Sequence, residues 1–414
     1  MNTPALSIAI LGLNYAPEDT GIAPYTASLA QGLVERGNAV HVITSHPHYP
    51  EWERRPGYSG WSRRYFESGV RVERKSHYVP KRPSGLRRAF SELSFGVRLV
   101  LAPWAETDVL ILVSPALFSS ALALIRARLS RRPRVVVVWV QDLYSLGIVE
   151  TGQGGRRLGR IMGRIESFVL RRATGVVVIH DRFKKHVVDA LGVPAADVVV
   201  LRNWSHLPPT PVVNRADTRR AMGWKDGEIV VLHSGNMGAK QGLENVINAA
   251  RYSTEEGLPL HFVLMGGGNQ RDRLVALGRQ IEGLSFVDSL SSSDYQAAMA
   301  SADVLLVNEK EGVAGMAVPS KLTSYFGTGL PVLAATDPGS VTRGEIEASG
   351  GGISVDAGDP RALAKAADSL GRDFDLSRQL GAAGLAFRIA NLSESAAIDR
   401  YAQWLIELVA KRRR

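Results

Sequence analysis

The sequence predicts an α/β protein built from two doubly wound, Rossmann-like domains. Short runs of Val, Ile and Leu alternate with amphipathic stretches along the chain, a pattern typical of parallel strands joined by crossover helices. A proline-rich segment at 207–211 interrupts this alternation, which then restarts. At roughly 100–200 residues per domain, a chain of 414 residues also indicates two domains.

In the first half, six apolar runs predict the strands of one sheet. They are residues 7–13, 39–44, 109–113, 134–140, 175–179 and 198–201. The helices expected between them include residues 22–36, 86–104, 116–128, 157–172 and 182–191. The N-terminus has no basic start, so we expect a first strand there and not a signal peptide. The longest apolar run, 109–125, is interrupted by Pro115, so we interpret it as a strand and a helix and not as a membrane span.

The second half repeats the pattern. The expected strands are residues 229–234, 261–265, 285–287, 304–307 and 331–335. The expected helices are residues 241–252, 270–280, 293–301, 319–328, 360–371, 376–390 and 394–411. We therefore expect an N-terminal domain at 1–206, a C-terminal domain at 207–392, and a final helix at 393–414 that packs back on the N-terminal domain.

Composition excludes several classes of protein. With no cysteine, the chain has no disulfide, no thiolate nucleophile and no Cys-based metal site. The net charge of +10 is uneven, because residues 1–200 hold 27 Lys and Arg against 16 Asp and Glu, whereas the rest of the chain is nearly balanced. This asymmetry indicates an anionic partner for the N-terminal half.

Four loops follow predicted strands and combine glycine with small or cationic side chains just before a helix. They are residues 14–23, 233–242, 265–269 and 309–322. Ligands of doubly wound sheets bind at the carboxyl ends of strands, where such loops lie. Glycine backbones and helix N-termini offer N–H donors, and Lys240 and Lys321 add positive charge, so these loops suit a diphosphate.

Four motifs occur in order along the chain: Asn14-Tyr15-Ala16-Pro17-Glu18, Pro47-His48-Tyr49-Pro50-Glu51-Trp52, Ser234-Gly235-Asn236-Met237-Gly238 and Val318-Pro319-Ser320-Lys321-Leu322. Together they resemble the retaining glycosyltransferases of family 4, which have the GT-B fold, and among them the colanic-acid-type exopolysaccharide members. The resemblance spans nearly the whole chain. It implies two domains facing a central cleft, with the acceptor on the N-terminal domain and a nucleotide diphosphate sugar on the C-terminal domain.

The loops and the resemblance together assign candidate roles. The candidate catalytic residues are Asp142, Lys240 and Lys321. The candidate donor-binding residues are Gly21, Gly235, Asn236, Lys240, Gln241, Gly266, Gly268, Val287, Leu290, Glu311, Pro319, Ser320, Lys321 and Ser324. The candidate acceptor-binding residues are Tyr15, His46, His48, Tyr49, Gln141 and His180.

The sequence departs from the family pattern at three places. Many members place Arg after the glycine of the second loop and Lys five positions later, whereas here Asn236 follows that glycine and Lys240 falls one position early. The usual pair of glutamates eight residues apart is replaced by Met316 and Ser324. An acceptor-side His of many relatives is replaced by Gln141.

No spacing of His, Asp and Glu predicts a metal site. The one D-x-D triplet, Asp373-Phe374-Asp375, lies between expected helices, which favours a helix cap over a metal-bound diphosphate. The resemblance likewise implies enzymes that need no metal, with positive side chains and helix N-termini stabilising the leaving diphosphate. We therefore expect no metal and no cofactor beyond the nucleotide sugar.

Three arginine-rich segments, 81–88, 126–134 and 156–172, supply most of the positive charge of the first half. The first leads into an expected helix that also contains Phe90 and Leu93, and a basic helix with apolar side chains suits an anionic membrane surface. A solvated basic face is the simpler alternative. No nucleic-acid-binding motif is present, so we expect no nucleic-acid partner.

The leading interpretation is a cytoplasmic hexosyltransferase, peripheral on the inner face of the cytoplasmic membrane. By resemblance, it would transfer a sugar from a GDP- or UDP-sugar, with GDP-fucose or GDP-mannose as the specific guess, to a lipid-linked oligosaccharide. The transfer would retain anomeric configuration and belong to extracellular polysaccharide biosynthesis. The alternatives are an enzyme of the same fold similar to sugar-nucleotide 2-epimerases, and a non-catalytic basic scaffold bound to the membrane.

Overall fold

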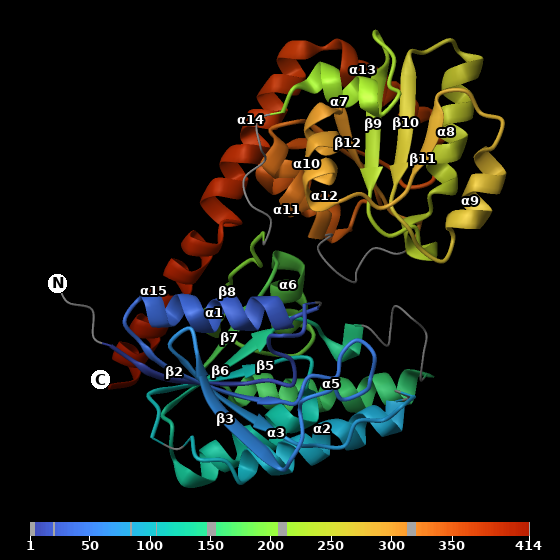
Figure 1. Cartoon of the computed structure of the whole chain (residues 1–414). Helices are drawn as coiled ribbons and strands as arrows, with labels where there is room; N and C mark the ends of the chain where they lie inside the picture. The colour runs from blue at the N-terminus through green and yellow to red at the C-terminus, as the bar shows by residue number, and fades with distance from the viewer. Residues whose placement is uncertain are drawn as a thin grey trace. The chain divides into compact units, whose positions relative to one another are not determined.

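The computed structural model describes residues 5–19, 21–82, 85–104, 106–146, 155–205, 213–312 and 320–413. The chain divides into two compact units (Figure 1). The first comprises Met1–Trp204 and Glu394–Arg414, and the second comprises Ser205–Ser393. The division after Trp204 lies two residues before the boundary that the sequence predicted.

The first unit contains an eight-stranded sheet with the order β3-β4-β2-β1-β5-β6-β7-β8. The strands are β1 (Ser7–Leu11), β2 (Ala39–Ser45), β3 (Ser62–Glu67), β4 (Val70–Lys75), β5 (Val109–Val113), β6 (Val135–Val140), β7 (Gly175–Val178) and β8 (Val198–Val200). All neighbouring strands are parallel except the antiparallel pair β3 and β4. The sequence prediction missed this pair.

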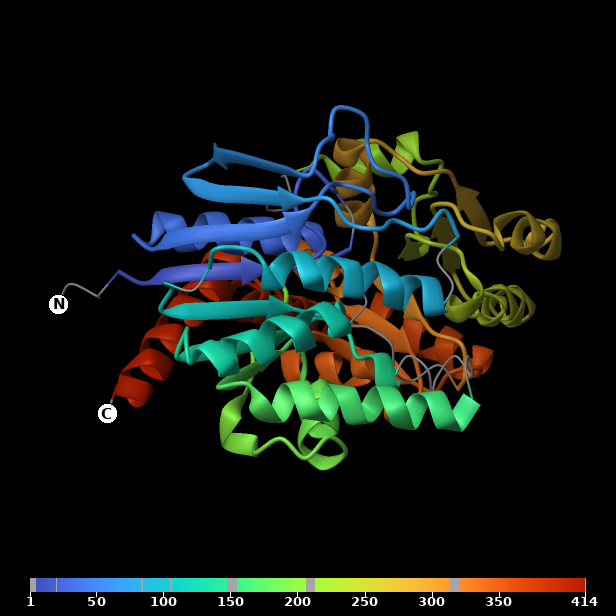
Figure 2. The same ribbon diagram turned by 90° about the horizontal axis from the view of Figure 1, so that it is seen from below.

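Helices cover both faces of this sheet. They are α1 (Ala23–Glu35), α2 (Gly85–Val100), α3 (Leu117–Ser130), α5 (Gly155–Arg172), α6 (Asp181–Asp189) and α15 (Glu394–Arg413). The apolar sides of α2, α3, α5 and α6 share one core with one face of the sheet, and α1 and α15 share a second core with the other face. The helices α2, α3 and α5 lie side by side (Figures 1 and 2).

The C-terminal helix α15 is part of the first unit although it is last in the chain. Its Tyr401 packs edge-on against Trp139 of β6, with ring centroids 5.4 Å apart. Trp404 and Ile398 lie so close to Gly175 and Gly32 that a Cβ atom at either glycine would collide with them. The helix is therefore packed into the core of the first unit.

The second unit contains a six-stranded parallel sheet with the order β11-β10-β9-β12-β13-β14. The strands are β9 (Ile229–Ser234), β10 (Leu260–Met265), β11 (Leu284–Val287), β12 (Val304–Asn308), β13 (Val332–Ala335) and β14 (Gly352–Val355). The helices are α7 (Arg215–Ala221), α8 (Glu244–Glu255), α9 (Arg271–Gly278), α10 (Ser292–Ser301), α11 (Ser320–Tyr325), α12 (Val341–Ser349), α13 (Pro360–Arg372) and α14 (Phe374–Asn391). The sequence prediction omitted α7, α12 and β14.

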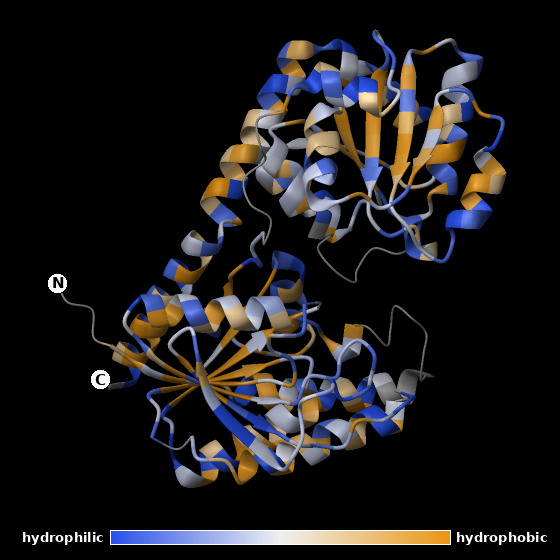
Figure 3. Cartoon of the chain, in the orientation of Figure 1, coloured by the Kyte–Doolittle hydropathy of each residue, from blue (hydrophilic) through white to orange (hydrophobic). Residues whose placement is uncertain are grey.

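The strand order of the second unit defines where a ligand can bind. From β9 the chain winds outward in one direction through β10 and β11, and in the other direction through β12, β13 and β14. The loops after β9 and β12 therefore diverge at a topological switch point, the usual ligand position of doubly wound sheets. Apart from β3 and β4, the strands of both units consist mainly of apolar residues (Figure 3), so the polar side chains lie mostly in the loops at their ends.

Candidate functional site

The loops after β9 and β12 are joined at the switch point of the second unit. The side-chain amide of Asn308, the last residue of β12, donates to the backbone oxygens of Gln241 (2.7 Å) and Gly242 (3.0 Å). The backbone N–H of Lys310 donates to the carbonyl oxygen of Lys240 at 2.9 Å. Side-chain and backbone contacts together therefore hold Asn308 and Lys310, at the start of the loop after β12, against the loop after β9.

The glycine-rich turn after β10 packs directly against the loop after β9. Met237 N–H donates to the Gly267 oxygen (2.7 Å), and Gly235 N–H donates to the Met265 oxygen (2.9 Å). Gly266 has φ +126°, and a Cβ atom there would collide with the carbonyl oxygen of Gly235. Only glycine allows this backbone approach, so the two glycine loops form one surface.

Lys321 of α11 places its ammonium group at this surface. Its Nζ lies 3.8 Å from the position of a Cβ on Gly235 and 3.3 Å from Nε2 of His233. Nδ1 of His233 faces the Leu306 carbonyl oxygen at 3.2 Å. Because a carbonyl oxygen only accepts hydrogen bonds, Nδ1 carries the proton and Nε2 accepts from Lys321.

Burial shifts both members of this pair towards their neutral forms. It lowers the pKa of Lys321 to about 8, with the charge of Glu309 acting in the opposite direction. Burial and the nearby ammonium of Lys321 lower the pKa of His233 well below its usual value. At neutral pH the pair is therefore a charged lysine supported by a neutral histidine.

Glu309, which follows β12, is itself held in place. Its two carboxylate oxygens accept hydrogen bonds from the hydroxyl groups of Thr336 and Thr342. These contacts use one acceptor position on each oxygen and fix the carboxylate near Lys321. Glu311, the predicted donor ligand two residues later, is exposed.

The structure brings the remaining predicted donor residues of the second unit to the carboxyl edge of its sheet. They follow β9 (Gly235, Asn236, Lys240, Gln241) and β10 (Gly266, Gly268), end or follow β11 (Val287, Leu290), or lie on α11 (Ser320, Lys321, Ser324). Pro319 and Met316 lie outside the described residues. Gly21 belongs to the first unit, where a Cβ would lie 3.4 Å from the ring of Tyr49.

In the first unit, buried Glu18 joins the loops after β1 and β2. Its Oε1 accepts from the backbone N–H groups of His48 (2.8 Å) and Tyr49 (2.9 Å), and its Oε2 accepts from Asn14 (2.9 Å). This carboxylate therefore positions two of the predicted acceptor residues. Tyr15, a third, is buried, and burial raises the pKa of its hydroxyl.

The predicted acceptor histidines of these loops are neutral. Nδ1 of His48 donates to the His46 carbonyl oxygen at 3.0 Å, which leaves Nε2 as an acceptor. Nε2 of His46 faces the Gly60 carbonyl oxygen at 3.2 Å and so carries the proton. Burial lowers the pKa of both rings. Each of these rings therefore has one nitrogen that donates and one that can accept a hydrogen bond, and it carries no positive charge.

The other predicted acceptor-side residues follow β6 and β7, which are neighbours in the sheet. Gln141 exchanges two hydrogen bonds with Asn203, at 2.7 and 3.1 Å. The exposed Asp142 accepts from the N–H of Leu143 at 2.8 Å. His180 caps α6 by accepting from Phe183 N–H (3.1 Å), and burial lowers its pKa to about 3.

Sequence reasoning missed a buried arginine beneath the acceptor-side loops. Arg74 of β4 is fully buried and donates to the backbone oxygens of Ser45 (2.8 Å) and Ala16, and to the Tyr65 hydroxyl (2.9 Å). It therefore joins the ends of the loops after β1 and β2 from below. Its sequence context, with Glu73 and Lys75 on either side, is typical of a solvated strand, so the sequence contained no signal for it.

Comparison with known proteins identifies the family. Residues 20–204 match the glycosyl transferase 4-like domain, and residues 214–386 match glycosyl transferases group 1. The chain is 33% identical over 335 residues to the putative colanic acid biosynthesis glycosyl transferase WcaI of Escherichia coli, covering 78% of this chain and 82% of that protein. The chain belongs to the family 4 glycosyltransferases.

A second relative agrees with this assignment, and a solved structure shows the fold. The glycosyltransferase is 27% identical over 331 residues to the probable glycosyltransferase WbjE of Pseudomonas aeruginosa, covering 79% of this chain and 81% of that one. Its fold is similar to that of HepE from Anabaena, solved in complex with UDP, with a TM-score of 0.69, 15% identity, and 97% and 100% of the two chains covered. The predicted GT-B fold of two Rossmann-like domains is therefore confirmed.

In the described part of this glycosyltransferase, no group of three or more His, Asp and Glu side chains is placed to hold a metal ion. The D-x-D triplet is at a helix end, as expected, because the Asp373 carboxylate caps α14 by accepting from Leu376 N–H at 2.9 Å.

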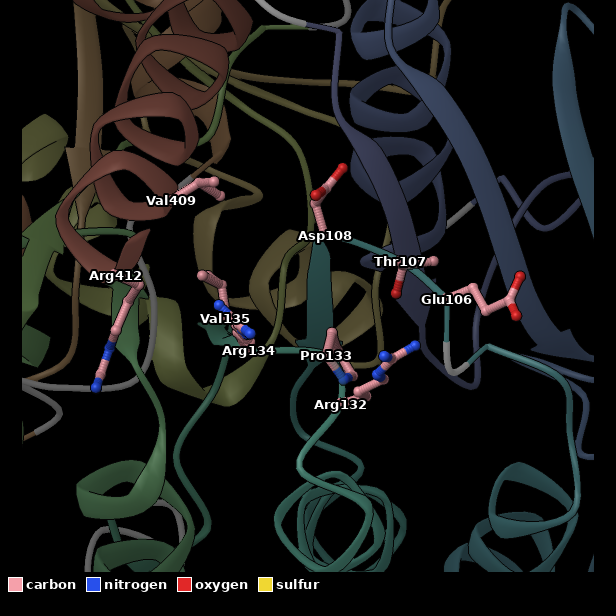
Figure 4. Close-up of a pocket in the computed structure, with 9 residues that line it drawn as sticks. All are labelled: Glu106, Thr107, Asp108, Arg132, Pro133, Arg134, Val135, Val409 and Arg412. Atoms are coloured by element: carbon pink, nitrogen blue, oxygen red, sulfur yellow. The ribbon is translucent and has the colours of Figure 1, made fainter. Parts of the chain in front are cut away.

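A hollow of about 360 Å³ in the first unit lies away from these residues. It is at the amino edge of the sheet and is lined by Arg132, Arg134 and Arg412 together with the carboxylates of Glu106 and Asp108 (Figure 4). No sequence-predicted site residue lines it. We therefore treat it as part of the charged surface of the glycosyltransferase and not as its reaction site.

Proposed function

We propose that this glycosyltransferase transfers a sugar from a nucleotide diphosphate sugar to a lipid-linked saccharide. The transfer retains anomeric configuration, takes place at the inner face of the cytoplasmic membrane, and contributes to an extracellular polysaccharide, as the name of the Escherichia coli relative suggests. The second unit binds the donor, and the loops after β1, β2, β6 and β7 of the first unit bind the acceptor.

One observation supports donor binding above all: the ammonium group of Lys321 at the joined glycine loops. Its neighbour His233 is neutral, and the carboxylate of Glu309 already accepts hydrogen bonds from two threonines. A diphosphate at the glycine loops would therefore contact the Lys321 ammonium group, which can pair with a second anion besides Glu309. As the sugar bond breaks, negative charge grows on the leaving diphosphate, and a fixed cation there stabilises the transition state.

Asp142 is the acceptor-side group with the best position for hydrogen bonding to a sugar hydroxyl. It is exposed, and its backbone is fixed because the Ser114 hydroxyl donates to its carbonyl oxygen at 2.8 Å. Gln141, its neighbour, has its amide engaged by Asn203. We therefore assign Asp142 to orient the acceptor and Gln141 to hold the loop.

The outer faces of α2, α3 and α5 support docking on a membrane. On α2, Leu86, Phe90, Leu93 and Val97 are spaced by four, three and four residues and are 37–79% exposed. The neighbouring helices add exposed apolar and basic side chains. These are Ile125, Arg128 and Leu129 of α3 and Ile161, Phe168, Arg171 and Arg172 of α5, several of which line one hollow. An apolar stripe with arginines around it matches an anionic phospholipid surface.

None of the helices that the structure describes is long and apolar enough to cross a membrane.

A donor panel tests the reaction. Thermal shifts with GDP, UDP and their sugars, GDP-fucose and GDP-mannose included, should identify the base, and transfer should follow only when a lipid-linked acceptor is added. Activity should persist in EDTA; loss that Mn²⁺ restores would contradict a metal-free reaction. Epimerisation of the donor without acceptor would favour an epimerase, and no shift with any nucleotide at millimolar concentration would favour a scaffold.

Vesicle co-sedimentation tests the membrane surface. The wild-type protein should bind phosphatidylglycerol vesicles and not phosphatidylcholine vesicles, and Phe90→Asp should reduce that binding. Phe374→Asp is the matched control, since Phe374 is similarly exposed (74%) but lies on α14 of the second unit. Equal binding to both kinds of vesicle, or an equal loss in both variants, would contradict docking through α2.

A further inference from the structure

Two buried carboxylates on α2 and α5 hold the Asp142 loop, defined here as residues 142–146, of which 144–146 form a helical turn. Glu92 of α2 is 2% exposed; its Oε1 accepts from the Tyr144 hydroxyl and its Oε2 from the backbone N–H of Phe118 (3.1 Å), in the first turn of α3. Through this one side chain, α2 is connected to both α3 and the loop.

Glu166 of α5 holds the same loop from its other side. It is 4% exposed, and its two carboxylate oxygens accept from the backbone N–H groups of Tyr144 and Ser145, the latter at 3.0 Å. Tyr144 is therefore held by its hydroxyl from α2 and by its backbone from α5. Burying a carboxylate costs free energy unless its oxygens accept hydrogen bonds. These contacts therefore stabilise the buried side chains of Glu92 and Glu166.

Arg88 extends the connection to a second acceptor-side loop. Its guanidinium carbon lies 5.5 Å from the centre of the Tyr144 ring and 6.0 Å from that of Trp52, and its Nε lies 4.0 Å from Oε1 of Glu92. Trp52 follows β2, and its ring packs edge-on against that of His48. One end of α2 thus contacts the loops that contain His48 and Asp142.

The same helices present their opposite faces to solvent. On α2, the exposed Phe90 and Leu93 lie within one turn of the buried Glu92. The helix also packs tightly on α3, because a Cβ at Gly96 would lie 3.0 Å from the Ser119 Cα. Because Glu92 and the exposed Phe90 and Leu93 lie on the same helix, any shift of α2 on a bound surface moves the Glu92 carboxylate with it.

We propose that Glu92, Tyr144 and Glu166 are positioning residues that couple docking of α2 and α5 on a lipid surface to the arrangement of the Asp142 loop. This inference rests on the membrane docking proposed above. On the surface, the hydrogen bonds of Glu92 and Glu166 to Tyr144 and Ser145 persist and keep Asp142 in place for the acceptor. Off the surface, these hydrogen bonds break more often and acceptor binding weakens.

Hydrogen exchange of the full chain tests the coupling without relying on turnover. On phosphatidylglycerol vesicles, but not phosphatidylcholine vesicles, the amides of Tyr144 and Ser145 should exchange about tenfold more slowly in the wild type, since both donate to Glu166. Tyr144→Phe should remove most of this protection while the protein still binds the vesicles. Tyr401→Phe is the control, because its buried hydroxyl has no hydrogen-bond partner in the described part of the chain.

Kinetics then distinguish positioning from a general structural effect. In Tyr144→Phe and Glu92→Gln, the acceptor KM should rise about tenfold and stimulation by anionic vesicles should fall, with the donor KM unchanged. Unchanged protection and stimulation in both variants would overturn the coupling, as would an equal rise in donor and acceptor KM. If no donor supports transfer, the proposed function fails, but the exchange experiment still decides whether docking orders the loop.

Discussion

At the scale of single residues, the sequence predicted which side chains gather but not how they are charged or paired. Lys321 was identified from its place beside Pro319 and Ser320, and the structure locates its ammonium beside His233. Nothing in the sequence shows that His233 must be neutral, because burial and the Lys321 ammonium lower its pKa, and both depend on the tertiary fold. Likewise, His180 was assigned to the acceptor, whereas the structure shows a helix cap; whether it also meets an acceptor stays a prediction.

Donor binding should weaken above pH 8 because of Lys321. Burial lowers the pKa of its ammonium group to about 8, so the free enzyme holds a charged lysine below that pH and a neutral one above it. A diphosphate binds the charged form, so the donor KM should rise by about tenfold per pH unit above pH 8. Initial rates at saturating acceptor between pH 6.5 and 9.5 measure this.

Substitutions provide the controls for that profile. Lys321→Arg keeps its charge throughout this range and should flatten the rise in donor KM. Lys225→Arg, at an exposed position, should leave the profile unchanged. A wild-type donor KM that stays constant to pH 9.5 would show that the Lys321 ammonium does not bind the diphosphate.

Glu92 should make the first unit less stable as pH rises towards neutrality. Burial raises its pKa from 4.5 to about 7, so between these values the folded state binds more protons than the unfolded state. The free energy of unfolding therefore falls with rising pH across this window. Glu92→Gln removes the effect, so from pH 5 to pH 8 its stability relative to wild type should increase, by up to about 3 kcal/mol.

Urea unfolding followed by tryptophan fluorescence measures this difference, since six of the seven tryptophans lie in the first unit. Glu407→Gln, an exposed substitution on α15, should follow the wild type at every pH. A stability difference between Glu92→Gln and wild type that does not change with pH would contradict the raised pKa.

At the scale of elements, the parallel strands and their crossover helices were predictable because buried strands of this kind are nearly pure Val, Ile and Leu. The pair β3 and β4 was not, since Arg63, Arg64, Glu73, Arg74 and Lys75 give it the composition of a loop. Glu73 pairs with Arg64 of the adjacent strand and with Lys75, and Arg74 lies over the Tyr58 ring, so the buried charges are compensated by partners that only the folded chain brings together. The short β14 and α12 were missed for lack of a long periodic pattern.

The glycine loops yield a test with an internal control. Gly266→Ala should destabilise the second unit by roughly 2 kcal/mol or more and abolish donor binding, because φ is positive and the new methyl would collide with the Gly235 carbonyl oxygen. Gly267→Ala, one residue away, has open space and should change stability by less than about 0.5 kcal/mol. Nucleotide-dependent thermal shifts compare the two. Similar behaviour of both variants would mean that the close approach of the loops does not determine donor binding.

At the scale of the whole molecule, the uneven charge of the sequence corresponds to a difference in charge between the two units. The excess of basic residues is in the first 200 positions, where α2, α3 and α5 combine arginines with exposed apolar side chains. The second unit uses a few placed cations, Lys321 above all, at the edge of its sheet. The chain crosses between the units twice, since α15 returns to the first unit after the second is complete.

Because α15 packs in the core of the first unit, a destabilising substitution near the end of the chain should lower the stability of that unit. Leu405 is fully buried in the core shared by α1, α15 and the sheet of the first unit, so Leu405→Ala should cost the first unit about 2–5 kcal/mol. Tryptophan fluorescence should report an earlier unfolding transition, while the stabilisation of the second unit by nucleotide should remain. Gln403→Ala, exposed on the same helix, should match the wild type. If Leu405→Ala instead weakened nucleotide binding and left the tryptophan transition unchanged, α15 would have to be assigned to the second unit.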